Sequence, residues 1–140
     1  MELKYLLFVL IITLNLNSTA QYFEQDAGFD PTLIPAAGQE AKIAYNNGIR
    51  FFQNKQYEQA INSFKQSILI EPEFAKAYLN RGAVFIQIEN YNGAIDDFNT
   101  AIKYDSTLVK AYYLRGRANE LNNEINAAIK DYTEAIAKGY

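Results

Sequence analysis

A nine-residue segment of this chain occurs twice in nearly the same form, thirty-four residues apart. FAKAYLNRG covers residues 74–82 and LVKAYYLRG covers residues 108–116. A period of this length indicates structural units that stack on one another, because each copy buries its apolar face against the next. The same spacing relates columns of equivalent residues: Gly48, Gly82 and Gly116; Ala60, Ala94 and Ala128; Phe64, Phe98 and Tyr132; Tyr57, Tyr91 and Ile125; Ser67, Ala101 and Ala135.

Each thirty-four-residue block contains the apolar pattern of two helices. Apolar residues recur at steps of three and four, as in Ala94, Ile95, Phe98, Ala101 and Ile102. This periodicity predicts amphipathic helices with one buried face. Polar breaks at 53–56, 89–90 and 122–123 separate the first helix of a block from the second.

The glycine column falls inside the first helix of each block, where glycine costs about 1 kcal/mol relative to alanine. Close approach of two helices would compensate for this cost. We expect the glycines to face the alanine column of the partner helix, and the aromatic four residues after each alanine to fill the wider part of the hairpin. The columns concerned are Gly48, Gly82 and Gly116 against Ala60, Ala94 and Ala128.

These features resemble the tetratricopeptide repeat, a thirty-four-residue helix-turn-helix unit with small residues at positions eight, twenty and twenty-seven. The resemblance implies an all-α, right-handed α-solenoid of three repeats, at residues 41–74, 75–108 and 109–140, in a domain that spans 39–140. It says less about function, because the family is defined by its scaffold. The pattern departs from that of the family at Ser106, where proline is usual, and at Ile125, where tyrosine is usual.

The resemblance also implies a concave groove on the first helices of the three repeats. Aromatic side chains in it would contact a ligand, and a row of lysines could hold carboxylates of an extended peptide. The lysines could equally be solvated surface residues. The residues expected to bind a peptide or partner protein in this groove are Lys42, Tyr45, Ile49, Phe52, Lys76, Leu79, Asn80, Lys110, Tyr113 and Arg117.

Some members of the family bind the terminal carboxylate of a chaperone tail with two lysines, two asparagines and an arginine. Asn80 and Lys110 match this clamp. Tyr45, Ile49 and Leu114 stand where a lysine, an asparagine and an arginine would be required. The clamp is incomplete, so this ligand class is not expected.

Composition argues against several other functions. The chain has no Cys and no His, which removes thiol nucleophiles, imidazole bases and the usual zinc sites. Its formal net charge of −3 does not favour nucleic acid. Asp96 and Asp97 point about 100° apart on a helix, and Asp131 is expected among solvated surface carboxylates. We therefore predict no enzymatic activity, no cofactor and no metal site.

The first twenty residues, MELKYLLFVLIITLNLNSTA, combine Lys4, an apolar run and a small-residue end at Ala20. This pattern is typical of a signal peptide at 1–20, cleaved near Ala20, and predicts export to a periplasm or out of the cell. The alternative is an uncleaved anchor, but the run is shorter than the roughly 20 residues that span a membrane, so the mature chain should not be membrane-spanning. Residues 21–38, with Pro31 and Pro35, should form an irregular linker that caps the first hairpin or lies in the groove.

The sequence therefore predicts an exported, non-enzymatic module that binds a peptide or partner protein. The alternative is a structural or assembly subunit that associates through the ends of the array. That alternative depends on the last repeat, where no following block would bury the apolar side chains of the second helix. These are Ile125, Ile129, Tyr132 and Ile136.

Overall fold

The computed structural model describes residues 37–140, and this part of the chain contains six helices and no strand. The helices are α2 (Ala37–Gln53), α3 (Tyr57–Ile70), α4 (Ala75–Gln87), α5 (Tyr91–Tyr104), α6 (Val109–Leu121) and α7 (Ile125–Ala137). The prediction of an all-α fold with two helices per block is confirmed. Because α2 begins at Ala37, Ala37 and Gly38 are helical rather than part of the linker. The predicted signal peptide and the rest of the linker lie outside the described residues.

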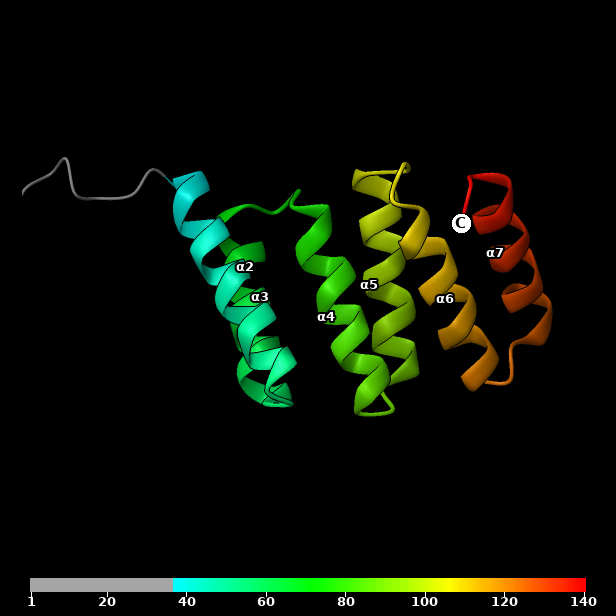
Figure 1. The fold of residues 1–140 in the computed structure, drawn as a ribbon, viewed down its shortest axis with the longest axis horizontal. Coiled ribbons are helices and arrows are strands. Elements are labelled where there is room, and N and C mark those ends of the chain that lie inside the picture. Colours follow the sequence, from blue (N-terminus) through cyan, green and yellow to red (C-terminus); the bar gives the residue numbers. More distant parts are fainter. Residues whose placement is uncertain (1–36) are drawn as a thin grey trace, which may run out of the picture. The chain divides into compact units, whose positions relative to one another are not determined.

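Consecutive helices pack as three hairpins, α2 with α3, α4 with α5, and α6 with α7. Further contacts join α3 to α4 and α5 to α6, so the hairpins follow one another in a row (Figure 1). Each hairpin covers an apolar face of the one before it. This arrangement is the α-solenoid that the thirty-four-residue period predicts.

The three hairpins turn at equivalent residues with a left-handed backbone. The φ angle is 59° at Lys55, 61° at Glu89 and 62° at Asn123. One residue later, the N–H of Asn90 donates to the carbonyl of Phe85 at 2.9 Å, and the other two turns have the equivalent bond. This bond closes a helix whose last turn ends in a left-handed residue, which is usually glycine. A side chain there costs about 1–2 kcal/mol, so hairpin packing must hold these turns in place.

The glycines of the first helices face aromatic rings. A methyl group added at Gly48 would lie 2.6 Å from Cε1 of Phe64, and one at Gly82 would lie 2.8 Å from Cε1 of Phe98. Gly116 has the same relation to the Tyr132 ring, at 2.9 Å. The atoms nearest to these glycines thus belong to the aromatic column and not to the alanine column that we expected them to face. Each glycine makes room for the aromatic ring of its partner helix.

The core is built from these rings and from small residues. Phe64, Phe98 and Val84 are fully buried, and so are most residues of the alanine column. Ser67 occupies the register of Ala101 and Ala135, and its buried hydroxyl has no hydrogen-bond partner. The first hairpin thus contains a polar defect that the other two avoid.

One face of α7 is left uncovered within the described residues. Ile129 is 58% exposed and Ile136 is 71% exposed. Their equivalents one repeat earlier, Ile95 and Ile102, pack against the core. The expectation of exposed apolar side chains on the last hairpin is confirmed for Ile125, Ile129 and Ile136. It is wrong for Tyr132, which is half-buried with its ring against Gly116.

Candidate functional site: the face of the first helices

The first helices of the three hairpins lie together on one side of the row. α2 contacts α4, and α4 contacts α6, whereas α3, α5 and α7 make no contact with one another within residues 37–140. The row therefore curves toward the first helices, because neighbours on the inner side of a curve approach each other more closely. We call the solvent-accessible side of α2, α4 and α6 the inner face.

The three predicted lysines of the groove are exposed on this face. All three lysines lie in the first half of their helices and are exposed, and the residue before each is buried or half-buried. The three are Lys42, Lys76 and Lys110. Arg117 is also exposed, and it lies two turns after Lys110 on the same side of α6. The inner face therefore presents a series of cations that no ion pair within the described residues neutralises.

The apolar residues predicted for the groove divide into two groups. Leu79 is only 7% exposed and packs in the core with Ala94 and Phe98, so it presents little surface to a ligand in this structure. Ile49 and Phe52 are half-buried and pack against the cluster around Phe64. The inner face is consequently less apolar than the sequence suggested.

Tyr45 and Asn80 join the first two repeats. The Asn80 amide nitrogen donates to the Tyr45 hydroxyl at 2.8 Å and to the Lys76 carbonyl at 2.9 Å. The Tyr45 ring packs against Phe74, with centroids 5.0 Å apart, and against Phe64. Burial raises the pKa of Tyr45, although the hydrogen bond from Asn80 opposes the rise, so the hydroxyl stays neutral. Both of these hydrogen bonds go to groups within the protein, so the Asn80 amide nitrogen has no N–H left to donate to a terminal carboxylate.

Tyr113 lies at the other end of the inner face, where three tyrosines meet. Its ring stacks on Tyr140, with centroids 4.3 Å apart and planes 12° apart, and is tilted against Tyr132 at 5.7 Å. Together with Ala135 and Ile136, these rings line a hollow of about 280 Å³. We call this hollow the tyrosine cup.

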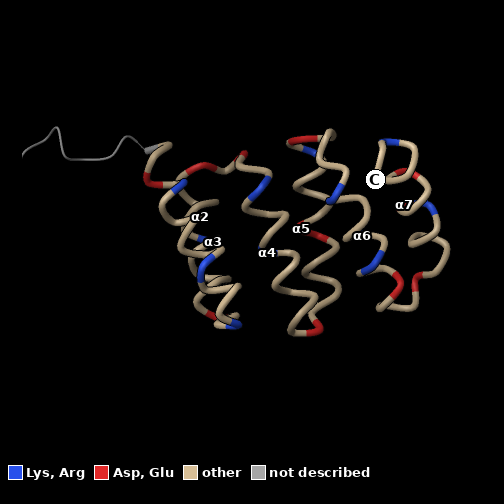
Figure 2. Tube along the Cα trace, in the orientation of Figure 1, with Lys and Arg blue, Asp and Glu red and all other residues tan. Residues whose placement is uncertain are grey.

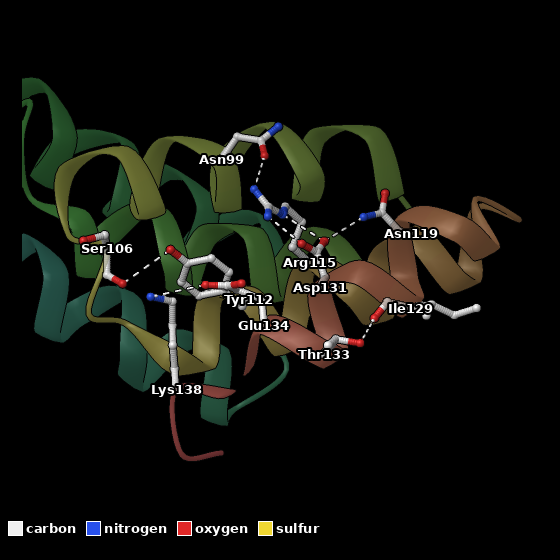
Figure 3. Close-up of polar contacts among 10 residues, drawn as sticks. All are labelled: Asn99, Ser106, Tyr112, Arg115, Asn119, Ile129, Asp131, Thr133, Glu134 and Lys138. Atoms are coloured by element: carbon white, nitrogen blue, oxygen red, sulfur yellow. Dashed lines mark hydrogen bonds and ion pairs between the residues drawn. The ribbon is translucent and has the colours of Figure 1, made fainter. Parts of the chain in front are cut away.

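Two buried ion pairs were not predicted from the sequence. Arg81 donates two hydrogen bonds to the carboxylate of Asp97, at 2.8 and 2.7 Å, and thereby joins α4 to α5. Arg115 makes the same pair of bonds to Asp131 between α6 and α7 (Figure 3). Asp131 is 4% exposed, so the expectation that it is a solvated surface carboxylate is wrong. The signal was present, because both arginines and both aspartates are thirty-four residues apart.

The geometry of these pairs indicates a structural role. Burial raises the pKa of Asp97, opposed by its hydrogen bonds from Arg81, and those bonds raise the pKa of Arg81. Arg115 donates a further bond to Asn99 of α5 at 2.7 Å, which ties the last hairpin to the one before it (Figure 3). Each charged group is occupied by its partner. Neither pair leaves a free acid or base for chemistry.

No cluster of three or more His, Cys, Asp or Glu side chains could hold a metal ion in residues 37–140. In the same part of the chain, every helix is too short or too polar to cross a bilayer.

Family models match most of this region. A TPR repeat model matches residues 48–88, and a tetratricopeptide repeat model matches residues 75–108 and again 109–137. The chain carries tetratricopeptide repeats. Among curated proteins, none matches it.

Many solved structures share the fold of these repeats. The Arabidopsis OM64 TPR domain is 26% identical, with a TM-score of 0.73, and the match covers 74% of this chain and 86% of that domain. The second TPR of Spaghetti (RPAP3), bound to the HSP90 peptide SRMEEVD, is 28% identical, with a TM-score of 0.70 over 71% of this chain and 93% of that one. The TPR2B domain of yeast Sti1 in its pHsp70 complex is also 28% identical, with a TM-score of 0.70 over 71% and 80%.

Proposed function

We propose that this chain is a non-enzymatic protein-interaction module whose inner face binds an acidic peptide or an acidic segment of a partner protein. The observation that carries the proposal is the uneven distribution of charge between first and second helices. α2, α4 and α6 together carry seven Lys and Arg and two Glu. α3, α5 and α7 carry three Lys and five Asp and Glu (Figure 2).

The first helices still have more cations than carboxylates when the arginines of the two ion pairs are left out of the count. Arg81 and Arg115 are neutralised by their aspartates. The first helices then carry five cations and two glutamates, whereas the whole chain has a formal net charge of −3. Clustered charge of one sign attracts and orients a partner of the opposite sign. The five are Lys42, Arg50, Lys76, Lys110 and Arg117.

The solved relatives support an acidic peptide as the ligand, but this chain lacks a complete clamp for the terminal carboxylate of such a peptide. The second TPR of Spaghetti (RPAP3) is bound to the HSP90 peptide SRMEEVD, which is acidic, and the TPR2B domain of yeast Sti1 is in a complex with pHsp70. In this chain Tyr45, Ile49 and Leu114 replace three cationic or amide side chains of a carboxylate clamp, and Asn80 is bonded to Tyr45. The proposed ligand is therefore held by exposed Lys and Arg side chains along its length, rather than by a clamp on its terminal carboxylate.

Exposed lysines provide a matched test of this function. The chain with Lys42, Lys76 and Lys110 all changed to Ser should lose capture of its partner from the cells that produce it. The control changes Lys65, Lys103 and Lys130 to Ser, which are exposed on the second helices and alter the net charge by the same amount. Equal capture by the two variants would contradict binding on the inner face.

Export is part of the proposal, and its support is the sequence pattern of residues 1–20. Intact-mass measurement of the protein from its own cells should show a chain that begins at or near Gln21. A chain that retains Met1 to Ala20 in the cytoplasm would contradict export. This result would leave the proposal for the inner face unaffected.

A second candidate function is assembly through the uncovered face of α7, where Ile129 is 58% exposed. Exposed apolar patches of this kind often mark association surfaces. Sedimentation should then show oligomers that Ile129→Asp disperses. Leu69→Asp is the control, because Leu69 is 74% exposed on α3 of the first hairpin. A monomer at high concentration would contradict this candidate.

A further inference from the structure

The tyrosine cup has walls that the backbone holds in place. Gly139 has a φ of 95°, and the N–H of Tyr140 donates to the Ala135 carbonyl at 3.0 Å, which turns Tyr140 back onto α7 and α6. In Figure 1 the end of the chain accordingly lies between α6 and α7. The hydroxyl of Tyr132, another lining residue, donates to Glu120 at 2.6 Å. This backbone bond and the hydrogen bond of Tyr132 restrict two of the tyrosines before any ligand arrives, which lowers the entropic cost of binding a side chain between them.

The lining of the cup selects for an apolar, flat occupant. Three tyrosine rings, Ala135 and Ile136 supply almost only carbon surface around a volume of about 280 Å³. The two faces of an aromatic ring can stack or tilt against such walls at the distances that Tyr113 already keeps from its neighbours. An aromatic side chain fits this description better than a branched aliphatic one.

Charge decides between a neutral aromatic group and a cation. A ring of tyrosines could bind an ammonium group through its π faces. Lys110 and Arg117, however, lie three residues before and four residues after Tyr113, on the same side of α6, and both are exposed. Among the described residues, Glu120, which accepts the hydrogen bond of the Tyr132 hydroxyl, is the one carboxylate that the contacts of the cup tyrosines place beside them. The two cations outweigh it, so they would repel a ligand cation and attract carboxylates that flank the occupant of the cup.

We propose that the tyrosine cup is a subsite for one aromatic side chain of the partner, and that Lys110 and Arg117 bind carboxylates on either side of that residue. This inference rests on the proposed function and narrows its ligand to an acidic segment with an embedded aromatic residue. The cup forms the end of the inner face at the third repeat. Tyr140 is its outer wall.

The absence of Trp from this chain gives a direct probe. The probe is the blocked peptide acetyl-Gly-Glu-Trp-Glu-Gly-amide, whose indole can be excited selectively. Mixing it with the protein should shift its emission to shorter wavelength as the ring enters the cup. The matched peptide with Lys in place of both Glu residues should show at least about tenfold weaker binding, because Lys110 and Arg117 repel it.

Variants of α7 locate the bound ring. Ile136→Ser should weaken binding of the Glu-Trp-Glu peptide about fivefold or more, as expected when a wall of an apolar anchor site is removed. Ile129→Ser is the control, because Ile129 is a similarly exposed residue of α7 that does not line the cup. Circular dichroism verifies that both variants fold.

Two results would overturn this proposal. One is an unchanged indole emission in the presence of the protein. The other is equal binding of the peptide to the Ile136→Ser and Ile129→Ser variants. If partner capture still depended on Lys42, Lys76 and Lys110 in either case, the proposed function would stand without the aromatic subsite. If capture did not depend on them, the proposed function would fail as well.

Discussion

The contact between Gly82 and Phe98 gives a prediction in which two known effects oppose each other. Changing Gly82 to Ala should gain about 1 kcal/mol of helix propensity. The added methyl carbon would lie 2.8, 3.0 and 3.1 Å from three ring carbons of Phe98, well inside the roughly 3.5–4.0 Å that carbon atoms prefer. Phe98 is fully buried, so any movement of its ring would displace the core residues around it. Overpacking of this kind costs about 1–3 kcal/mol.

The cost of overpacking against Phe98 should exceed the gain in helix propensity, so Gly82→Ala should lower the free energy of unfolding by about 1 kcal/mol. Denaturant unfolding measures the change, with Gly38→Ala as the control, because nothing lies within 4 Å of a methyl group added there. Gly38→Ala should be neutral or stabilising. Phe98→Leu should reduce the cost of Gly82→Ala in the double variant. If Gly82→Ala stabilised the protein as Gly38→Ala does, the explanation of the glycine column would be refuted.

Three further predictions concern single side chains. Ser67→Ala should raise the free energy of unfolding by about 1 kcal/mol, because it removes a buried hydroxyl without a partner; a loss of stability in urea would show that the hydroxyl is satisfied. Glu89→Gly should raise the free energy of unfolding by about 0.5–1 kcal/mol, because relief of the left-handed backbone at a φ of 61°, about 1–2 kcal/mol, exceeds the entropic cost of glycine, about 0.5–1 kcal/mol. Gln87→Gly, inside α4, should lower the free energy of unfolding. Burial, with help from the hydrogen bond to Glu120, raises the pKa of Tyr132 to about 12. The folded state therefore keeps a proton that the unfolded state loses above pH 10, and stability should fall between pH 10 and 12. Tyr132→Phe should make that fall shallower in melts at these pH values, and an unchanged slope would contradict the shift.

The solenoid was predictable because its main causes are local and repeat. Apolar steps of three and four residues place one helix face in the core, and polar breaks end the helices near Lys55, Glu89 and Asn123. Residues that recur at the thirty-four-residue period, such as Phe64 and Phe98, mark the positions that pack in the core. A thirty-four-residue period therefore carries most of the information needed for this fold.

The inner face was less predictable, because a small rotation of a helix about its axis decides whether a residue at a groove position is exposed or buried. Leu79 lies at a groove position by register, yet it is buried against Phe98. Asn80 looked like part of a carboxylate clamp, but a tyrosine from the previous repeat takes its donor. The cup depends on Tyr140, which lies outside the periodic columns and reaches Tyr113 through a turn at Gly139.

The buried pairs show a signal that was visible and given the wrong weight. Arg81 and Arg115 share a register, as do Asp97 and Asp131, and each pair is separated by sixteen residues. Single charged residues on helices are usually solvated, which favoured that interpretation for Asp131. A charge that recurs in register with an opposite charge on the partner helix is better explained by an ion pair across the hairpin.

Amide hydrogen exchange of the protein with its captured partner tests the central claim most directly. Binding on the inner face predicts slower exchange in α2, α4 and α6, strongest around Lys76 and around Lys110 to Arg117, with little change in α3 and α5. Protection confined to α3 and α5, or to the uncovered face of α7 alone, would contradict the account.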